Sequence, residues 1–583
     1  MNTLLPSKKR TSTQYQLKFH DDLVSDRQEV ANAFNKNFNN ILDTMKNLDH
    51  TCTDICSTIV ENTESFSFDD ITIEFVLKEL KSVNCNKAVG IDKLHPKLLK
   101  LAADYIARPL SFLYNVSLRT AEIPTDFKIA KIIPLYKGGN KLDINNYRPI
   151  SLLPIPAKIL ERAVHAQLYK YFDENSLLSS IQSGFRPMHS TQTCVTDISE
   201  YILRNMNSGN ITGAIFLDLR KAFDVISHTR LLKKLSMYGI RNFELEWFKS
   251  YITDRLHCVS IEGTLSKYLK VKSGVPQGST LGPLMFSIFI NDISNLILDE
   301  SCKLSLYADD TAIFCTDKNI HDVQLKLQSQ FGTITKWLQC NDLFLNSEKT
   351  KTMLFGSNRK LTGKKLAIMY KNDILEHVKE FKYLGVVLDG SLNWTSHVDH
   401  VVKKISQAIG CIRRVKCYLT KEIMIDLFYS LVLPHIDFSC TVWGSCGQTN
   451  ISRIQRLQNK YARMVLGMDL FTSASFLLST LNWQSVKQRI RYQQTVLVFK
   501  ILHGQAPRYL NTLIQRRDVN YTTRYATCSP LFVPTPRTEY MKRSICYCGS
   551  KLFNSLPITV HCCNSLTKFK SDVRRISYTW ALR

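Results

Sequence analysis

Two adjacent aspartates, Asp309 and Asp310, stand between two short runs of apolar residues. The runs cover residues 304–307 and 311–315, and each has the length and the residue types of a short β-strand. Strands separated by so few residues form an antiparallel hairpin. The sequence therefore predicts a β-hairpin that presents both carboxylates at its tip.

A third aspartate, Asp218, lies near the end of another strand-like segment, residues 213–219. Taken alone, a strand-end aspartate is usually a cap or turn residue, and an Asp-Asp pair is usually solvated. Nucleotide addition to a 3′-hydroxyl, however, needs two cations about 4 Å apart, and magnesium prefers hard oxygen ligands from rigid elements. Two or three such carboxylates on rigid strands would suffice for two Mg²⁺ ions, with Mn²⁺ as a substitute, although each of these signals is weak by itself.

The chain has 583 residues, and single cores stop growing at about 250–300 residues, so two or three domains are expected. Apolar patterns predict a strand over 129–135 and helices over 29–42, 70–82, 227–238 and 281–290. From about residue 396 the pattern becomes helical and basic. We therefore expect an α+β catalytic body followed by a helical region.

Positive charge is concentrated in the last third of the chain. Residues 401–583 hold 27 Lys and Arg against 7 Asp and Glu, while the whole chain has a net charge of +26. A field of this kind suits a polyphosphate partner, because binding a polyanion releases its counterions. Nucleic acid is the expected partner, with a merely solvated basic surface as the alternative.

The periodicity of residues 451–466 predicts an amphipathic helix with a basic face. Apolar residues recur at three- and four-residue steps, and basic residues recur at the same period, offset by two positions. At about 100° per residue the bases lie roughly opposite the apolar seam and could contact phosphates. A second such helix is expected over 398–415. The predicted phosphate contacts of the first helix are Arg453, Arg456, Lys460 and Arg463.

The chain's 17 cysteines are scattered without a regular framework, and no apolar signal region follows Met1. Both features indicate a reducing intracellular setting, in the nucleus and cytoplasm, where disulfides are not expected. Cys52 with Cys56, and the group from Cys546 to Cys563, lack the spacing of zinc ligands. The most apolar stretch, residues 427–443, contains Pro434, His435 and Asp437, so a buried segment is expected and a membrane span is not.

Several short motifs occur in a characteristic order. They are Asn86-Lys-Ala-Val-Gly-Ile-Asp92, Ile133-Pro-Leu-Tyr-Lys137-Gly, Asn146-Tyr-Arg148-Pro, Gln182-Ser-Gly-Phe-Arg186-Pro, Phe216-Leu-Asp218 with Ala222-Phe223-Asp224, Gly274-Val-Pro-Gln277-Gly278, Tyr307-Ala-Asp309-Asp310, Leu345-Asn346-Ser-Glu-Lys349 and Phe381-Lys-Tyr-Leu-Gly385. With these motifs the chain resembles the reverse transcriptases of non-LTR (LINE-type) retrotransposons, in particular the jockey-like branch, over roughly residues 28 to 575.

This resemblance implies a right-hand polymerase with fingers and a palm built on an antiparallel sheet, followed by a basic helical thumb. The implied regions are an N-terminal extension over 1–84, fingers and palm over 85–390, and thumb and C-terminal region over 391–583. The implied activity is RNA-directed DNA synthesis. Its partners would be an RNA template, a DNA primer or target and deoxynucleoside triphosphates, with no membrane.

The resemblance and the chemistry together suggest roles for individual residues. Asp218 and Asp309 would hold the metals, with Asp310 as a weaker ligand. Asp224 is expected to cap the following helix and stays outside the metal set. The expected substrate contacts are Lys137 and Arg148 on the triphosphate, Phe223 under the sugar, Gln277 at the nascent base pair, and Lys349, with Lys351 as its competitor, at the leaving pyrophosphate.

Two alternatives stay open. An RNA-templated RNA polymerase would share the carboxylates but select ribonucleotides, and an inactive relic of an element would only bind RNA. No further carboxylate cluster suited to an endonuclease or RNase H is evident after residue 400. We therefore expect a truncated or fragmentary product of such an element, or a reading frame annotated from too late a start.

Overall fold

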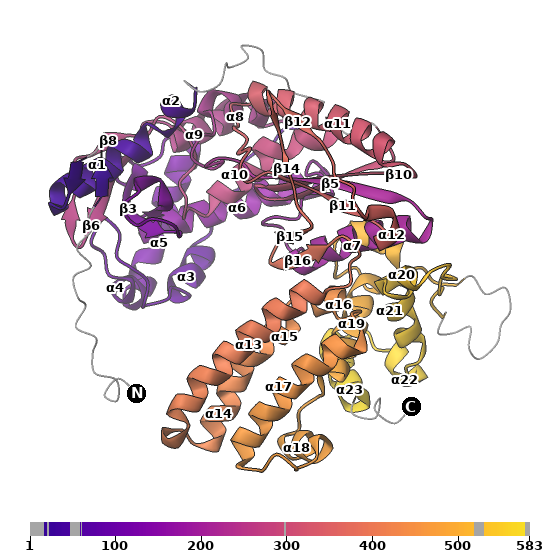
Figure 1. The fold of residues 1–583 in the computed structure, drawn as a ribbon. Coiled ribbons are helices and arrows are strands. Elements are labelled where there is room, and N and C mark those ends of the chain that lie inside the picture. The colour runs from indigo at the N-terminus through magenta and orange to yellow at the C-terminus, as the bar shows by residue number, and fades with distance from the viewer. Residues whose placement is uncertain are drawn as a thin grey trace. The chain divides into compact units, whose positions relative to one another are not determined.

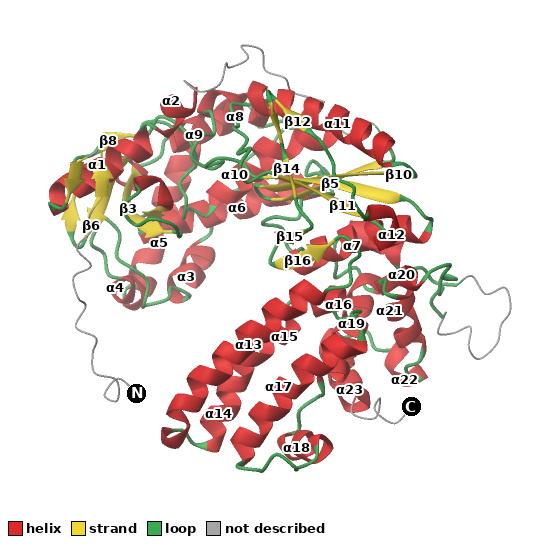
Figure 2. Ribbon diagram, viewed as in Figure 1, coloured by secondary structure: helices red, strands yellow, loops and turns green. Residues whose placement is uncertain are grey.

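The structure is a computed structural model that describes residues 17–19, 22–46, 59, 61–296, 299–517 and 530–577 (Figure 1). Helices and mixed sheets alternate through it (Figure 2), which confirms the expected α+β class. The chain divides into two units. Unit 1 comprises residues 1–179, 219–296 and 333–345, and unit 2 comprises residues 180–218, 297–332 and 346–583.

Unit 2 is built around a five-stranded sheet with the order β14-β11-β5-β10-β9. The central strand, β5 (Ile211–Leu217), is buried at every position and mostly apolar, as expected for a strand covered on both faces. It pairs antiparallel with both neighbours. The other strands are β9 (Cys302–Tyr307), β10 (Asp310–Asp317), β11 (Lys351–Phe355) and β14 (Glu376–His377).

Helices of unit 2 share one apolar core with this sheet. Residues of α7 (Thr191–Asn207), β5 and β10 belong to the same buried cluster as residues of α13 (Thr395–Val415) and α17 (Gln448–Leu466). A second cluster joins the C-terminal helices. Further helices of this unit include α12 (Asn358–Leu361), α14 (Lys421–Leu427), α15 (Leu433–Asp437), α16 (Cys440–Trp443), α18 (Ala474–Leu481), α19 (Val486–Leu502), α20 (Glu539–Lys542), α21 (Ile545–Asn554), α22 (Ile558–His561) and α23 (Leu566–Ser577).

Unit 1 contains a second sheet with the order β4-β3-β6-β7, with β8 also paired to β6. Its strands are β3 (Ile129–Tyr136), β4 (Tyr147–Leu152), β6 (Leu256–Ile261), β7 (Thr264–Leu265) and β8 (Leu269–Lys270). The main helices are α1 (Arg27–Asn39), α3 (Ile73–Lys81), α5 (Ala103–Thr120), α6 (Ile155–Glu174), α8 (His228–Met237), α9 (Asn242–Ile252) and α10 (Leu281–Ile290).

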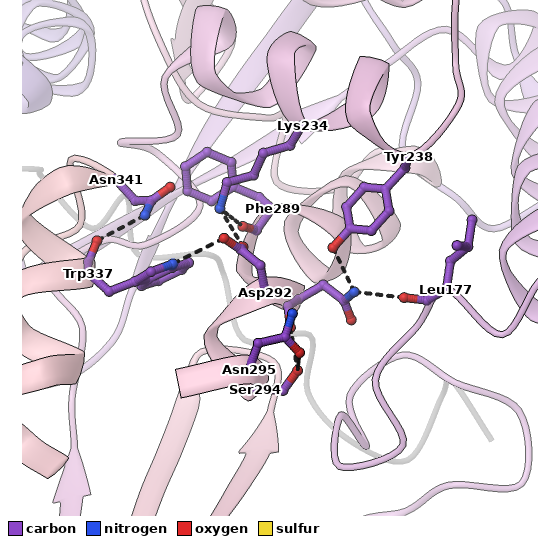
Figure 3. Close-up of polar contacts among 10 residues, drawn as sticks. Leu177, Lys234, Tyr238, Phe289, Asp292, Ser294, Asn295, Trp337 and Asn341 are labelled. Carbon is purple, nitrogen blue, oxygen red and sulfur yellow. Dashed lines mark hydrogen bonds and ion pairs between the residues drawn. The ribbon is translucent and has the colours of Figure 1, made fainter. Parts of the chain in front are cut away.

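A fully buried ion pair lies in the core of unit 1. The Lys234 ammonium of α8 donates to Asp292 Oδ1 at 2.6 Å and to the carbonyl oxygen of Phe289 at 2.7 Å. Trp337 Nε1 donates to Asp292 Oδ2 at 3.1 Å, and Figure 3 shows Lys234 and Trp337 converging on this carboxylate. Both side chains of the pair have 0% exposure. Such a pair persists because each charge keeps its hydrogen-bond partners.

Most predicted elements are confirmed within a few residues. The helix expected over 281–290 is α10, and the one over 227–238 is α8. The strand expected over 213–219 begins two residues earlier and ends at Leu217. Helix 29–42 is broken at Asn40 into α1 and α2 (Ile41–Lys46). The domain boundaries at 84 and 390 stay a prediction.

The expectation that disulfides are absent is wrong at one place. Cys302 and Cys315 face each other on β9 and β10 and are joined by a disulfide. Strand pairing brings their side chains to the same face, a proximity that the linear sequence does not display. Cys52 and Cys56 lie outside the described residues. None of the described helices has both the length and the apolar composition to cross a membrane.

Candidate active site

The β9–β10 hairpin confirms the predicted position of the paired aspartates. Tyr307 pairs with Asp310, so the turn consists of Ala308 and Asp309 alone. Ala308 takes a left-handed backbone conformation with φ 55°, as two-residue hairpin turns require. The strands are longer and the turn is tighter than the sequence pattern suggested.

Strand register brings Asp218 to the same end of the sheet. Leu217 of β5 is paired with Thr311 of β10, so Asp218 and Asp310 are the next residues along these antiparallel strands. The Asp218 carboxylate accepts a hydrogen bond from Asn346 Nδ2 at 3.1 Å, and its carbonyl oxygen accepts one from the Asn346 amide at 2.8 Å. Asn346 therefore fixes the carboxylate, a role that we did not assign from its motif.

A buried glutamine accepts a hydrogen bond from the backbone of the hairpin turn. Gln182 Oε1 accepts hydrogen bonds from the amides of Gly184 at 2.8 Å and Ala308 at 3.0 Å. The backbones approach so closely that a Cβ on Gly184 would lie 2.4 Å from the Ala308 nitrogen. Only glycine fits there. Gln182, which lies outside the β9–β10 hairpin, therefore holds the turn that carries Asp309. The Gln182-Ser-Gly motif alone did not indicate this role.

The donor set at this end of the sheet suits magnesium. Asp218 and Asp309 are partly exposed and Asp310 is exposed, and carboxylate oxygens are the hard ligands that magnesium prefers. Within the described residues, however, no group of three or more His, Cys, Asp or Glu side chains is assembled closely enough to hold a metal ion. The assignment of these aspartates as metal ligands stays a prediction.

In unit 1 the predicted Gln277 is held by Asp224. Gln277 Nε2 donates to Asp224 Oδ1 at 2.7 Å, and the Gln277 carbonyl oxygen accepts from the Ser151 amide at 2.7 Å. Burial raises the pKa of Asp224 to about 6. The interpretation of Asp224 as a helix cap is wrong, because the Ser227 side chain caps α8. Asp224 instead orients the amide of Gln277.

Phe223 is stacked on a second aromatic ring. Its ring centroid lies 4.4 Å from that of Phe286 on α10, with an interplanar angle of 23°. Phe223 is partly buried and Phe286 is fully buried. The carbonyl oxygen of Phe223 accepts from the Val275 amide at 3.0 Å. No sequence pattern singled out Phe286, because an apolar helix residue is usually an ordinary core residue.

The two predicted triphosphate contacts come from one hairpin of unit 1. Lys137 follows β3 and its amide donates to the Asn146 carbonyl oxygen at 2.9 Å. Arg148 lies on β4 opposite Leu135. Both side chains are exposed, which suits a contact with a mobile polyphosphate. Their role stays a prediction.

Lys349 and Lys351 differ in their surroundings. The Lys351 ammonium is engaged by the Glu376 carboxylate in an ion pair between β11 and β14. Lys349 lies in the loop that begins at Asn346, and its side chain is exposed. Lys351 would have to break its ion pair before it could contact a substrate, so we retain Lys349 as the predicted proton donor.

The basic helix is confirmed as amphipathic, but its four selected cations are not equivalent. Arg453 forms an ion pair with Asp399 of α13 at 2.5 Å, and Arg463 donates to the Thr472 carbonyl oxygen at 3.1 Å. Arg456 and Lys460 are exposed. Within the described residues neither has an acidic partner at ion-pair distance. We call Arg456 and Lys460 the α17 ridge.

Comparison with known proteins relates residues 137–388 to a family described as reverse transcriptase (RNA-dependent DNA polymerase). Over 441 residues the chain is 28% identical to the probable RNA-directed DNA polymerase from transposon BS of Drosophila melanogaster, covering 73% of this chain and 48% of that protein. It is 28% identical to the RNA-directed DNA polymerase from mobile element jockey of the same fly, covering 69% and 44%.

The jockey polymerase of Drosophila funebris is 27% identical, with 77% of this chain and 49% of that protein covered. The chain thus spans about half the length of the curated relatives it matches. The matched family segment contains the three aspartates, Phe223 and Gln277.

Proposed function

We propose, from the match of residues 137–388 to the reverse transcriptase family, that this chain is the RNA-directed DNA polymerase of a jockey-like non-LTR retrotransposon. It would extend a DNA primer along an RNA template with deoxynucleoside triphosphates. The observation that carries the proposal is the register of β5 and β10 within the matched segment, which supports Asp218 and Asp310 sharing one end of the sheet beside Asp309. Polymerisation is the only activity proposed for this chain.

Asp218 and Asp309 would hold two Mg²⁺ ions, with Asp310 as a weaker ligand. When bound, such ions activate the primer hydroxyl and neutralise charge on the leaving pyrophosphate. Asn346 keeps the Asp218 carboxylate in one orientation, and Gln182 keeps the Asp309 turn rigid. Rigid carboxylates matter here because small displacements of catalytic groups cost large factors in rate.

The remaining predicted residues would act on the nucleotide. Lys137 and Arg148 would bind the triphosphate, Arg148 with its planar guanidinium. Lys349 would protonate the departing pyrophosphate. Gln277, oriented by Asp224, would lie against the nascent base pair, and Phe223 would pack under the sugar, where its ring leaves no space for a 2′-hydroxyl.

In this proposal the β-sheet of unit 2 corresponds to a polymerase palm, the β3–β4 region to fingers, and α13 with α17 to a thumb. The α17 ridge would contact the phosphate backbone of the template–primer duplex without reading bases. Such contacts give affinity for any sequence, which a template-copying enzyme requires.

The test is primer extension on an RNA template by the Asp309→Asn variant. Loss of one negative ligand is expected to lower extension by more than about 100-fold, while duplex binding, which depends on the basic region, stays close to that of the parent. Asp317→Asn is the matched control, because Asp317 lies at the far end of the same strand in an ion pair with Lys326.

Extension by Asp309→Asn within a few-fold of the parent would refute the catalytic assignment. A parent that binds the duplex but extends with neither nucleotide type would identify an inactive relic. A parent that prefers ribonucleotides would identify an RNA polymerase.

A further inference from the structure

We propose that Phe286, a residue buried behind the predicted substrate site, is a positioning residue that sets the enzyme's choice between deoxyribose and ribose. The inference rests on the proposed function and deepens it. It starts from the stacked pair of Phe223 and Phe286 in unit 1, whose ring centroids are 4.4 Å apart.

The backbone of Phe223 is immobilised by the chain segment that precedes Gln277. The Val275 amide donates to the Phe223 carbonyl oxygen at 3.0 Å. A Cβ on Gly274 would lie 2.8 Å from that oxygen, so the two segments are in direct contact. The main chain of Phe223 is therefore held in place. The position of its ring then depends on the side chains that pack against it, which include Phe286.

Behind the ring lies α10, which is anchored near both ends. The Thr280 amide at its start donates to the buried carboxylate of Glu161 at 2.6 Å. Near its end the buried Lys234 ammonium binds the carbonyl oxygen of Phe289 and the carboxylate of Asp292 (Figure 3). Every residue of the helix except Pro283 is buried. A helix anchored in this way does not move easily when a side chain is pressed against it.

Phe286 transmits that rigidity to Phe223. Its side chain has 0% exposure, and close-packed interiors yield little when pressed. A ribose 2′-hydroxyl that pushed on the Phe223 ring would press it against Phe286 and the anchored helix. A smaller side chain at 286 would leave a void into which the Phe223 ring could move. The steric barrier at Phe223 would then soften, although Phe223 itself is unchanged.

The variant Phe286→Leu tests this role. The measurement is the ratio of kcat/KM for a deoxyribonucleotide to kcat/KM for the matching ribonucleotide on one RNA template. Phe286→Leu is expected to lower the ratio by about tenfold. Phe289→Leu is the matched control, because Phe289 lies on the same helix, has the same 0% exposure and contacts Lys234, whereas Phe286 is the residue of this helix whose ring is seen stacked on Phe223.

The control is expected to leave the ratio within about twofold of the parent, although it too creates a void in the core. A double variant, Phe223→Val with Phe286→Leu, is expected to discriminate no worse than Phe223→Val alone, because Phe286 acts through the Phe223 ring. If the Leu variant does not fold, Phe286→Met is the second variant, because its flexible thioether side chain can adapt to the space that the ring leaves, and it is expected to lower the ratio by a smaller factor.

Equal ratios for Phe286→Leu and Phe289→Leu, or a further additive loss in the double variant, would overturn the inference. A parent that polymerises with a strong deoxyribonucleotide preference, which Phe223→Val weakens and Phe286→Leu does not, overturns the inference and leaves the proposed function intact. A parent without that preference overturns both.

Discussion

The two units use charged side chains in opposite ways. In unit 1, Lys234 and Asp292 are fully buried and bind each other, a backbone carbonyl and the Trp337 indole. In unit 2, Arg456 and Lys460 of the α17 ridge are exposed, with no acidic partner among the described residues. Both arrangements contain cations on helices. Lys234 is inaccessible to solvent and to ligands, whereas Arg456 and Lys460 are accessible to both.

The difference separates charges that fix structure from charges available for binding. A buried charge that loses its partner remains without solvent, and the unfolded state is favoured. An exposed cation is solvated in either case, so its removal changes stability little. It can change affinity for a polyanion substantially, because each phosphate contact releases a counterion.

The largest effect is expected from Asp292→Ala. The variant leaves the Lys234 ammonium buried without its carboxylate, and we expect the free energy of unfolding to fall by about 3–5 kcal/mol. Chemical denaturation followed by fluorescence measures it. Glu246→Ala is the control, because its ion pair with Lys249 at 2.9 Å is exposed and is worth less than about 1 kcal/mol. Comparable losses of unfolding free energy in both variants would show that the buried and the exposed ion pair do not differ in their contribution to stability.

A smaller effect, dependent on pH, is expected at Asp224. Its pKa is about 6 in the folded chain and about 3.9 in an unfolded chain, so its contribution to stability is present below about pH 3.9 and is lost as the pH rises through 6. Asp224→Asn keeps an acceptor for Gln277 but cannot ionise.

The Asn variant is therefore expected to match the parent near pH 4 and to exceed its free energy of unfolding by ~3 kcal/mol at pH 8. Thermal unfolding of both proteins across this range measures the difference. A difference that does not vary with pH would show that folding does not raise the pKa of Asp224, which would then behave like the exposed charges and not like the buried pair.

The smallest change in free energy is expected at the α17 ridge. Arg456→Glu with Lys460→Glu should weaken template–primer binding by about tenfold and lower the log–log salt slope by up to about 0.9 for each lost contact. Unfolding should be nearly unchanged. Fluorescence anisotropy at several salt concentrations gives the slope, and Lys568→Glu with Lys570→Glu on α23 is a control of equal charge. An unchanged slope would make the ridge an ordinary solvated surface.

Local pattern was sufficient where one side-chain periodicity dominates. The apolar run of α10 and the paired aspartates between two β-type runs predicted their elements closely. The pattern failed where partners come from distant segments. Asp224 resembles a helix cap in sequence but binds Gln277, 53 residues away. Lys234 was only a charged residue in a predicted helix, yet Leu231 and Leu235, both buried, flank it on one helix face. The three- and one-residue spacing of Lys234 from these two leucines was the feature that could have predicted its burial.

The amino-acid sequence by itself determined the α+β class, the amphipathic basic helix and the ordered motifs, because these depend on residue types at short spacing. Only the tertiary structure decided that Asn346 and Gln182 position the aspartates, that Arg453 is engaged by Asp399, and that the Phe286 ring is stacked on that of Phe223. The physical reason is the same in each case. A hydrogen bond, ion pair or ring stack acts over a few ångströms, and the fold brings together residues that the chain separates by tens or hundreds of positions.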